Sequence, residues 1–145
     1  LLQDRVAFKQ MIDGFAAHYR DQKIDLILGI ESRGFLLAAA LAYALNTGLI
    51  IARKPGKLPY HVVNSNQYTT EYSVDVLHMH KDSISKDQNV LIIDDVLATG
   101  GTANAAQQLV TKSGGNVVGF AFLLELGFLN GRTILGAPVH SLLQY

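Results

Sequence analysis

The stretch that decides the fold is VLIIDDVLATGGT, at positions 90–102. Its first four residues are apolar and have the character of a buried strand, and the carboxylates Asp94 and Asp95 follow them at once. An ordinary surface turn needs one Gly or one Asp, and two adjacent carboxylates repel each other. We therefore expect a ligand or a cation to relieve that repulsion. The simpler alternative is that both carboxylates merely face solvent at a strand end.

The turn after these carboxylates combines small residues with the start of a predicted helix. Ala98, Gly100 and Gly101 leave backbone N–H groups unobstructed, and Thr102 stands where the helix should begin, as its cap. Such a turn, together with a helix N-terminus, forms a cradle for a phosphate dianion. The predicted phosphate-binding residues are Ala98, Thr99, Gly100, Gly101 and Thr102.

The motif differs from the two commonest phosphate-binding loops. No Gly-Lys-Ser/Thr follows the glycines, and no G-x-G-x-x-G suggests a dinucleotide site. Because carboxylates do not bind phosphate, Asp94 and Asp95 suit the vicinal hydroxyls of a sugar, or a Mg²⁺ ion reached directly or through water. A phosphate and a diol close together describe ribose 5-phosphate.

Composition narrows the class of protein. Lys plus Arg and Asp plus Glu number twelve each, so there is no bulk charge to attract nucleic acid or an anionic membrane surface. The chain has no cysteine, which excludes disulfides and thiolate metal sites and is compatible with a reducing compartment. No apolar run is long enough to span a bilayer, and no signal peptide is visible. We expect a soluble, cytoplasmic protein that forms a single domain over residues 1–145.

Apolar runs alternate with helical patterns along the chain. Periodicity predicts strands at 25–30, 49–52, 74–79, 90–93 and 117–124, and helices at about 5–20, 34–45 and 102–112. Asp4 is placed to cap the first helix, and Gly114-Gly115 to close the last. Continuously apolar strands that alternate with helices indicate an α/β fold, a mainly parallel twisted sheet flanked by helices. Ligands of such sheets bind at the carboxyl ends of the strands.

One region, residues 53–73 (RKPGKLPYHVVNSNQYTTEYS), is irregular. Its first half is basic and contains Arg53, Lys54 and Lys57, and its second half is polar. A loop this long inside a compact domain is usually functional. We therefore predict a flexible lid here, and the alternative is a loose insertion without a role.

The opening stretch resembles the motif that binds 5-phosphoribosyl 1-pyrophosphate (PRPP) in the type I phosphoribosyltransferases, and its DD and ATGGT are similar to the adenine-specific members. Further segments match in the same order, namely ESRGF at 31–35, RKPGKLP at 53–59, EY at 71–72, LLEL at 123–126 and SLLQY at 141–145. The resemblance covers nearly the whole chain.

The resemblance implies a reaction in which adenine and PRPP give AMP and pyrophosphate, with Mg²⁺ held mainly by PRPP and in part by Asp94 or Asp95 through water. It also implies a homodimer, since loop residues of the family can reach the neighbouring subunit's site. Two alternatives are an enzyme for another purine base and a non-catalytic regulator of the same fold that senses PRPP or nucleotides. The retained Glu71 and the absence of a basic surplus argue against the regulator.

Roles for individual residues follow from the same resemblance. Glu71 matches the general acid/base, while Asp94 and Asp95 hold the ribose hydroxyls and stabilise the positive character of the sugar carbon. Ala98 and Leu126 match positions on either side of the purine, and Tyr72 belongs to the lid. The peptide bond before Ser32 is expected to be cis. The residues that match pyrophosphate-binding positions are Ser32, Arg33, Arg53, Lys54 and Lys57.

One departure concerns the start of the chain. Family members carry further residues before the position of Leu1, and that segment contributes backbone contacts to adenine. We expect the sequence as given to lack this base-binding segment.

Overall fold

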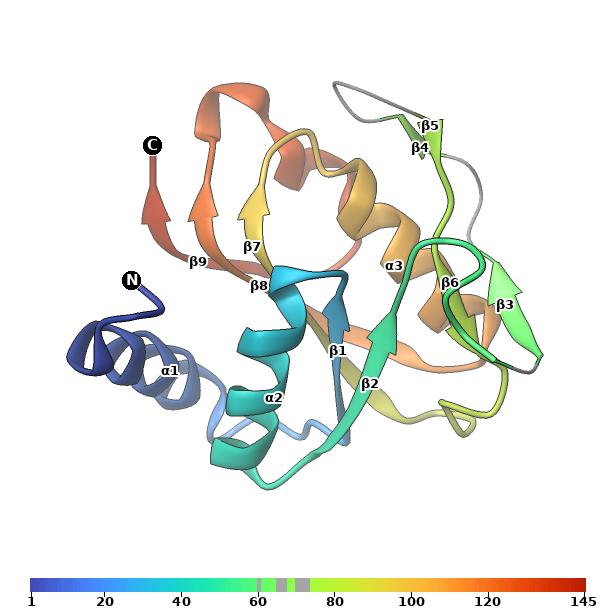
Figure 1. Ribbon diagram of the computed structural model, residues 1–145, viewed down its shortest axis with the longest axis horizontal. Coiled ribbons are helices and arrows are strands. Elements are labelled where there is room, and N and C mark those ends of the chain that lie inside the picture. Colours follow the sequence, from blue (N-terminus) through green and yellow to red (C-terminus); the bar gives the residue numbers. More distant parts are fainter. Residues whose placement is uncertain (60, 65–67, 70–73) are drawn as a thin grey trace.

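The fold is built on a five-stranded parallel sheet, seen in a computed structural model that describes residues 1–59, 61–64, 68–69 and 74–145. The strand order is β2-β1-β7-β8-β9, and every neighbouring pair is parallel (Figure 1). The predicted mainly parallel α/β sheet is therefore confirmed. The strands are β1 (Leu26–Ile30), β2 (Gly48–Ala52), β7 (Asn89–Leu97), β8 (Asn116–Glu125) and β9 (Val139–Gln144).

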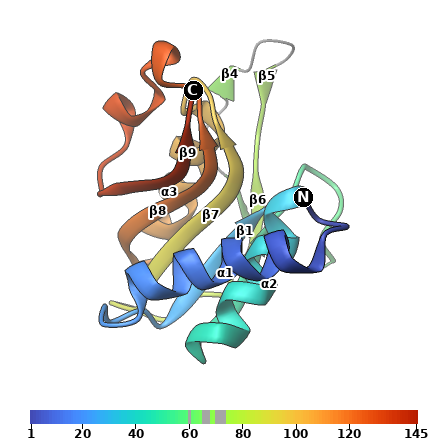
Figure 2. The same cartoon turned by 90° about the vertical axis from the view of Figure 1, so that its left-hand side faces the viewer.

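Helices cover both faces of this sheet, as Figures 1 and 2 show. Helices α1 (Arg5–Tyr19) and α2 (Arg33–Leu45) pack on one face, and α3 (Gly101–Lys112) packs on the other. Successive strand residues point to opposite faces, so Leu91 joins the core under α1 and α2 while Ile92 joins the core under α3. This burial on both sides explains why the strands are continuously apolar.

The helix boundaries follow from local chemistry. Asp4 caps α1, because its Oδ1 accepts the backbone N–H groups of Val6 and Ala7 at 2.9 and 3.1 Å. Asn46 ends α2 in the left-handed conformation, with φ of 55°. Gly114, just beyond the end of α3, has φ of 85°, as predicted for a closing glycine.

Two predicted boundaries near the decisive stretch were wrong. Strand β7 does not stop at Ile93 but continues to Leu97, so Asp94 and Asp95 lie within it. The reason is tertiary, since β8 runs alongside and keeps pairing as far as Leu97 with Glu125. Thr102 is not the cap of α3, which begins at Gly101 with Gly100 as its N-cap residue.

The region predicted as one loop and one strand is also subdivided. Strand β3 (Val62–Asn64) pairs antiparallel with β6 (His78–His80), and β4 (Tyr68–Thr69) pairs antiparallel with β5 (Val74–Asp75). The predicted strand 74–79 is therefore two strands in two separate ribbons, and two short strands lie in the predicted loop 53–73.

Three elements after β8 were not predicted. These are the single-turn helices η1 (Gly127–Leu129) and η2 (Gly131–Ile134) and the edge strand β9. Figure 1 shows both short helices beyond the carboxyl ends of the central strands. Among the described residues, no helix is long and apolar enough to cross a membrane.

Candidate active site

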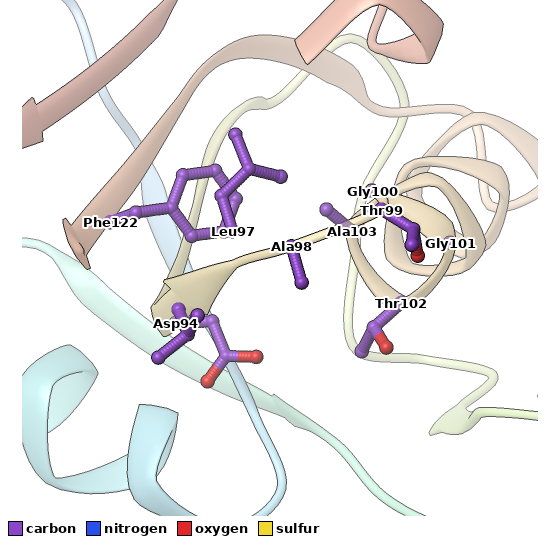
Figure 3. A pocket seen from close by; sticks show the side chains of 10 residues that line it. Asp94, Leu97, Ala98, Thr99, Gly100, Gly101, Thr102, Ala103 and Phe122 are labelled. Carbon is purple, nitrogen blue, oxygen red and sulfur yellow. The ribbon is translucent and has the colours of Figure 1, made fainter. Parts of the chain in front are cut away.

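The connection between β7 and α3 lines a pocket of about 200 Å³ at the carboxyl edge of the sheet. In Figure 3, the side chains of Asp94, Ala98 and Thr102 lie on one side of this connection, and those of Leu97 and Phe122 lie on the other. All five predicted phosphate-binding residues line the pocket together with Asp94. Apolar side chains, among them Leu97 and Phe122, also line it. The lining residues are Asp94, Val96, Leu97, Ala98, Thr99, Gly100, Gly101, Thr102, Ala103 and Phe122.

The start of α3 is open to an anion because no side chain caps it. The first N–H groups of a helix have no partner within the helix, and they carry the positive end of its dipole. Gly100 adopts φ of 86°, which aims the chain into the helix without a side chain over the opening. The turn therefore has the chemistry of the predicted phosphate cradle.

Asp94 reaches the pocket because the start of α2 carries a glycine beside it. A Cβ atom on Gly34 would lie only 2.9 Å from Asp94 Oδ1. The same oxygen accepts the backbone N–H of Asp95 at 2.9 Å. Burial raises the pKa of Asp94 to about 8, and the neighbouring Asp95 carboxylate adds to the effect. A ligand donor or a cation at this position would favour the charged form.

Asp95 faces a second, larger cavity of about 400 Å³, which Arg33 also lines. The Nε of Arg33 donates to Asp95 Oδ2, and this ion pair raises the pKa of Arg33. A residue predicted to bind pyrophosphate thus lies directly beside one predicted to hold the ribose hydroxyls. The peptide bond between Glu31 and Ser32 is cis, as the resemblance implied.

The predicted pyrophosphate residues of the basic segment, Arg53, Lys54 and Lys57, gather around a carboxylate that sequence reasoning missed. Glu31 directly follows β1, and its carboxylate accepts hydrogen bonds from Lys57 Nζ at 2.8 Å, from the backbone N–H of Lys54 at 2.6 Å and from Arg53 Nη2 at 3.4 Å. Its side chain is only 7% exposed. Burial of the carboxylate raises the pKa of Glu31, but these donors, led by Lys57, outweigh that effect and hold the pKa below its usual value. The only sequence signal was an acidic residue directly after a buried strand.

The two predicted base-binding residues follow neighbouring strand ends. The backbone N–H of Leu126 donates to the carbonyl oxygen of Leu97 at 2.9 Å, which places Leu126 beside the residue that precedes Ala98. Glu71 and Tyr72, the predicted acid/base and lid residues, lie outside the described residues.

Comparison with known proteins agrees with this arrangement. Residues 2–128 match the phosphoribosyl transferase domain family. Adenine phosphoribosyltransferase of Solibacter usitatus is 55% identical over 146 aligned positions, which cover all of this chain and 84% of the relative.

Solved structures give the same result. Adenine phosphoribosyltransferase of Thermoanaerobacter pseudethanolicus superposes with a TM-score of 0.95 at 45% identity, covering 99% of this chain and 84% of the other. The Trypanosoma brucei enzyme, in complex with AMP, pyrophosphate and ribose-5-phosphate, superposes with a TM-score of 0.92 at 33% identity, covering 99% and 66%. The chain belongs to the adenine phosphoribosyltransferases, within the phosphoribosyl transferase domain family.

Proposed function

We propose that this chain transfers the 5-phosphoribosyl group of PRPP to adenine and releases AMP and pyrophosphate, a reaction of purine salvage. The observation that carries the proposal is the single pocket in which an uncapped helix start and Asp94 lie together. A phosphate site and a carboxylate within one pocket match the two ends of a ribose 5-phosphate. The relatives' names and the ligands of the Trypanosoma brucei enzyme support the same substrates.

Different residues of the chain bind the different charged and polar groups of PRPP. The 98–102 turn holds the 5′-phosphate, Asp94 and Asp95 accept the ribose hydroxyls, and Arg33 lies where negative charge develops on the departing pyrophosphate. The second group of cations, Arg53, Lys54 and Lys57, serves the same pyrophosphate together with Ser32.

Adenine stacks between Ala98 and Leu126. As its ring nitrogen bonds to the sugar carbon, the carbon–pyrophosphate bond breaks and adenine gives up a ring proton. Glu71 is the proposed acceptor of that proton, and Tyr72 belongs to the segment that closes over the site.

The two adjacent carboxylates of β7 fit Mg²⁺. Asp94 or Asp95 would offer hard oxygen acceptors to the ion through water. Burial raises the pKa of Asp94 because it disfavours the charged carboxylate, and a cation nearby would offset that cost. No group of three or more His, Cys, Asp or Glu side chains is placed to hold a metal among the described residues, so oxygens of PRPP would complete the shell. When bound, the ion neutralises charge on the pyrophosphate.

The chain works as a cytoplasmic homodimer in this proposal. Helix α2 exposes Leu36 and Tyr43, which lie two turns apart on one helix face and are 52% and 92% exposed. Apolar surface of this kind supports a second copy as its partner. Molecular mass in solution, measured by light scattering, tests the assembly.

The experiment that tests the function is formation of AMP from adenine and PRPP with Mg²⁺, compared with hypoxanthine as the base. We expect turnover with adenine and nearly complete loss in the Asp94→Asn/Asp95→Asn double variant, with the fold retained by circular dichroism. Wild-type turnover in the double variant would exclude the ribose assignment.

A further inference from the structure

The phosphate turn rests on a backbone segment that comes much later in the chain. A Cβ atom on Gly131 would lie 2.2 Å from the carbonyl oxygen of Ala98 and 2.9 Å from the backbone nitrogen of Gly100. In the other direction, a Cβ atom on Gly100 would lie 2.4 Å from the carbonyl oxygen of Gly131. The two backbones are therefore in direct contact, and a displacement of Gly131 must displace the turn.

Gly131 is held in place by the charged residue that follows it. Arg132 Nε donates to Glu125 Oε1 at 2.7 Å, and Arg132 Nη2 donates to Glu125 Oε2 at 2.5 Å. A bidentate ion pair of this kind fixes the orientation of the guanidinium as well as its distance from the carboxylate. The position of Arg132 is thus tied to the last residue of β8.

Glu125 is also held by hydrogen bonds from β9. Its side chain is only 4% exposed, and Oε2 also accepts Ser141 Oγ at 2.9 Å and Gln144 Nε2 at 3.4 Å, both from β9. Hydrogen bonds from Arg132 are the largest cause that holds the pKa of Glu125 below its usual value. A buried carboxylate so completely bonded is a rigid anchor rather than a mobile surface charge.

We propose that the Glu125–Arg132 ion pair is a positioning element for the phosphate turn, acting through the backbone contact between Gly131 and Gly100. The inference rests on the proposed function of the 98–102 turn as the 5′-phosphate site. Neither residue touches the phosphate. They set the place from which the N–H groups of the turn meet it, and such bonds weaken steeply when the donors move by a fraction of an ångström.

A purely structural role for the pair predicts a different result. Loss of packing alone would lower the melting temperature and the active fraction, and would weaken all ligands equally. Loss of positioning weakens AMP and PRPP, which carry the 5′-phosphate, while pyrophosphate alone keeps its affinity. Pyrophosphate binding is therefore the internal reference.

The test is calorimetric titration of the full chain with AMP and, separately, with pyrophosphate and Mg²⁺. We expect Arg132→Met to raise the Kd of AMP and the KM of PRPP about tenfold, with pyrophosphate within about twofold of wild type. Arg132→Lys keeps the charge but not the bidentate geometry, and its AMP affinity should lie between those of wild type and Arg132→Met. Lys9→Met, which removes an exposed ion pair with Asp13 on α1, is the matched control and should bind both ligands normally.

A double-mutant cycle tests whether Arg132 acts on the phosphate turn through the backbone of Gly131. In a Gly131→Ala background the contact is already disturbed, so adding Arg132→Met should change AMP affinity by less than about twofold. Unchanged AMP affinity in folded Arg132→Met, or parallel losses for AMP and pyrophosphate, overturns the inference. If Arg132→Met does not fold, the same comparison on Arg132→Lys decides. A wild-type chain that binds no AMP would instead overturn the proposed function.

Discussion

Arg33, in the first turn of α2, and Asp95, in β7, form an ion pair across the carboxyl edge of the sheet. One partner is the proposed pyrophosphate ligand and the other a proposed ribose ligand. PRPP carries both groups on adjacent carbons, so its binding requires Arg33 to share or exchange its carboxylate partner.

Changing Arg33 to Met should therefore separate binding from stability. We expect the Kd of pyrophosphate and the KM of PRPP to rise at least about tenfold, because a charge-assisted donor is lost. Arg33 is 70% exposed, so the free energy of unfolding should change by less than about 1 kcal/mol. Titration calorimetry and thermal melts measure both quantities. Arg20→Met, an exposed arginine at the end of α1, is the control, and an equal loss in that variant would contradict the assignment.

The buried carboxylate of Asp94 predicts a trade between stability and activity. Its pKa in the folded chain is raised to about 8 from an ordinary value of 3.8, so the folded state binds the proton more tightly than the unfolded state. The stability that this provides is full below about pH 4 and is lost as pH rises through about 8. In ligand-free melts, Asp94→Asn should gain about 1–3 kcal/mol over wild type at pH 9 and much less at pH 5.

The same Asn variant should turn over far more slowly, since an amide is a poorer partner for ribose hydroxyls and for a cation. Parallel melting curves for variant and wild type across this pH range would show that Asp94 does not titrate as proposed.

Glu31 should act as the anchor of the basic segment after β2. Removing its carboxylate with Glu31→Ala frees Lys57 and Arg53 and leaves the Lys54 N–H without its acceptor. We expect the KM of PRPP to rise about tenfold and the chain to lose about 1–3 kcal/mol of stability. Glu31→Gln keeps an acceptor and should lie nearer wild type. Tighter pyrophosphate binding in the Ala variant would instead mean that Glu31 competes with the ligand.

Two glycines with similar backbone angles allow a matched test of the phosphate turn. Gly100 and Gly56 have φ of 86° and 77°, but a Cβ atom on Gly100 would strike the Gly131 carbonyl oxygen, whereas one on Gly56 meets nothing within 4 Å. Gly56→Ala should cost about 1 kcal/mol, from the left-handed conformation alone. Gly100→Ala should cost more and should abolish detectable AMP binding. Equal effects of the two substitutions, measured by melts and AMP titration, would contradict a close-packed turn.

Local signals carried most of the prediction from sequence. The cap at Asp4 and the closing glycine at position 114 depend on residues close together in the chain, and both lie where they were expected. The order strand, turn and helix around the 98–102 turn was also predicted, although β7 ends later and α3 begins earlier than expected. The pocket at the carboxyl edge follows from the parallel sheet itself.

What the sequence could not supply depends on partners far away. The length of β7 is set by its register with β8, so the place of Asp94 inside the strand could not be read locally. Glu31 meets Lys57, and Glu125 meets Ser141, only after the strands assemble, and neither spacing has a periodic pattern. The short edge strand β9 is apolar for too few residues to stand out.

We expect the contact between Gly131 and Gly100 to set the order of folding events during synthesis as well. A nascent chain that has emerged only as far as α3 contains every residue of the phosphate turn, but not the backbone against which the turn is set. Completion of the turn waits for η2 and for the β9 residues that fix Glu125. A ribosome-bound fragment ending after α3 is thus expected to carry the motif without its affinity, and we expect AMP to be retained only once η2 and β9 have been added.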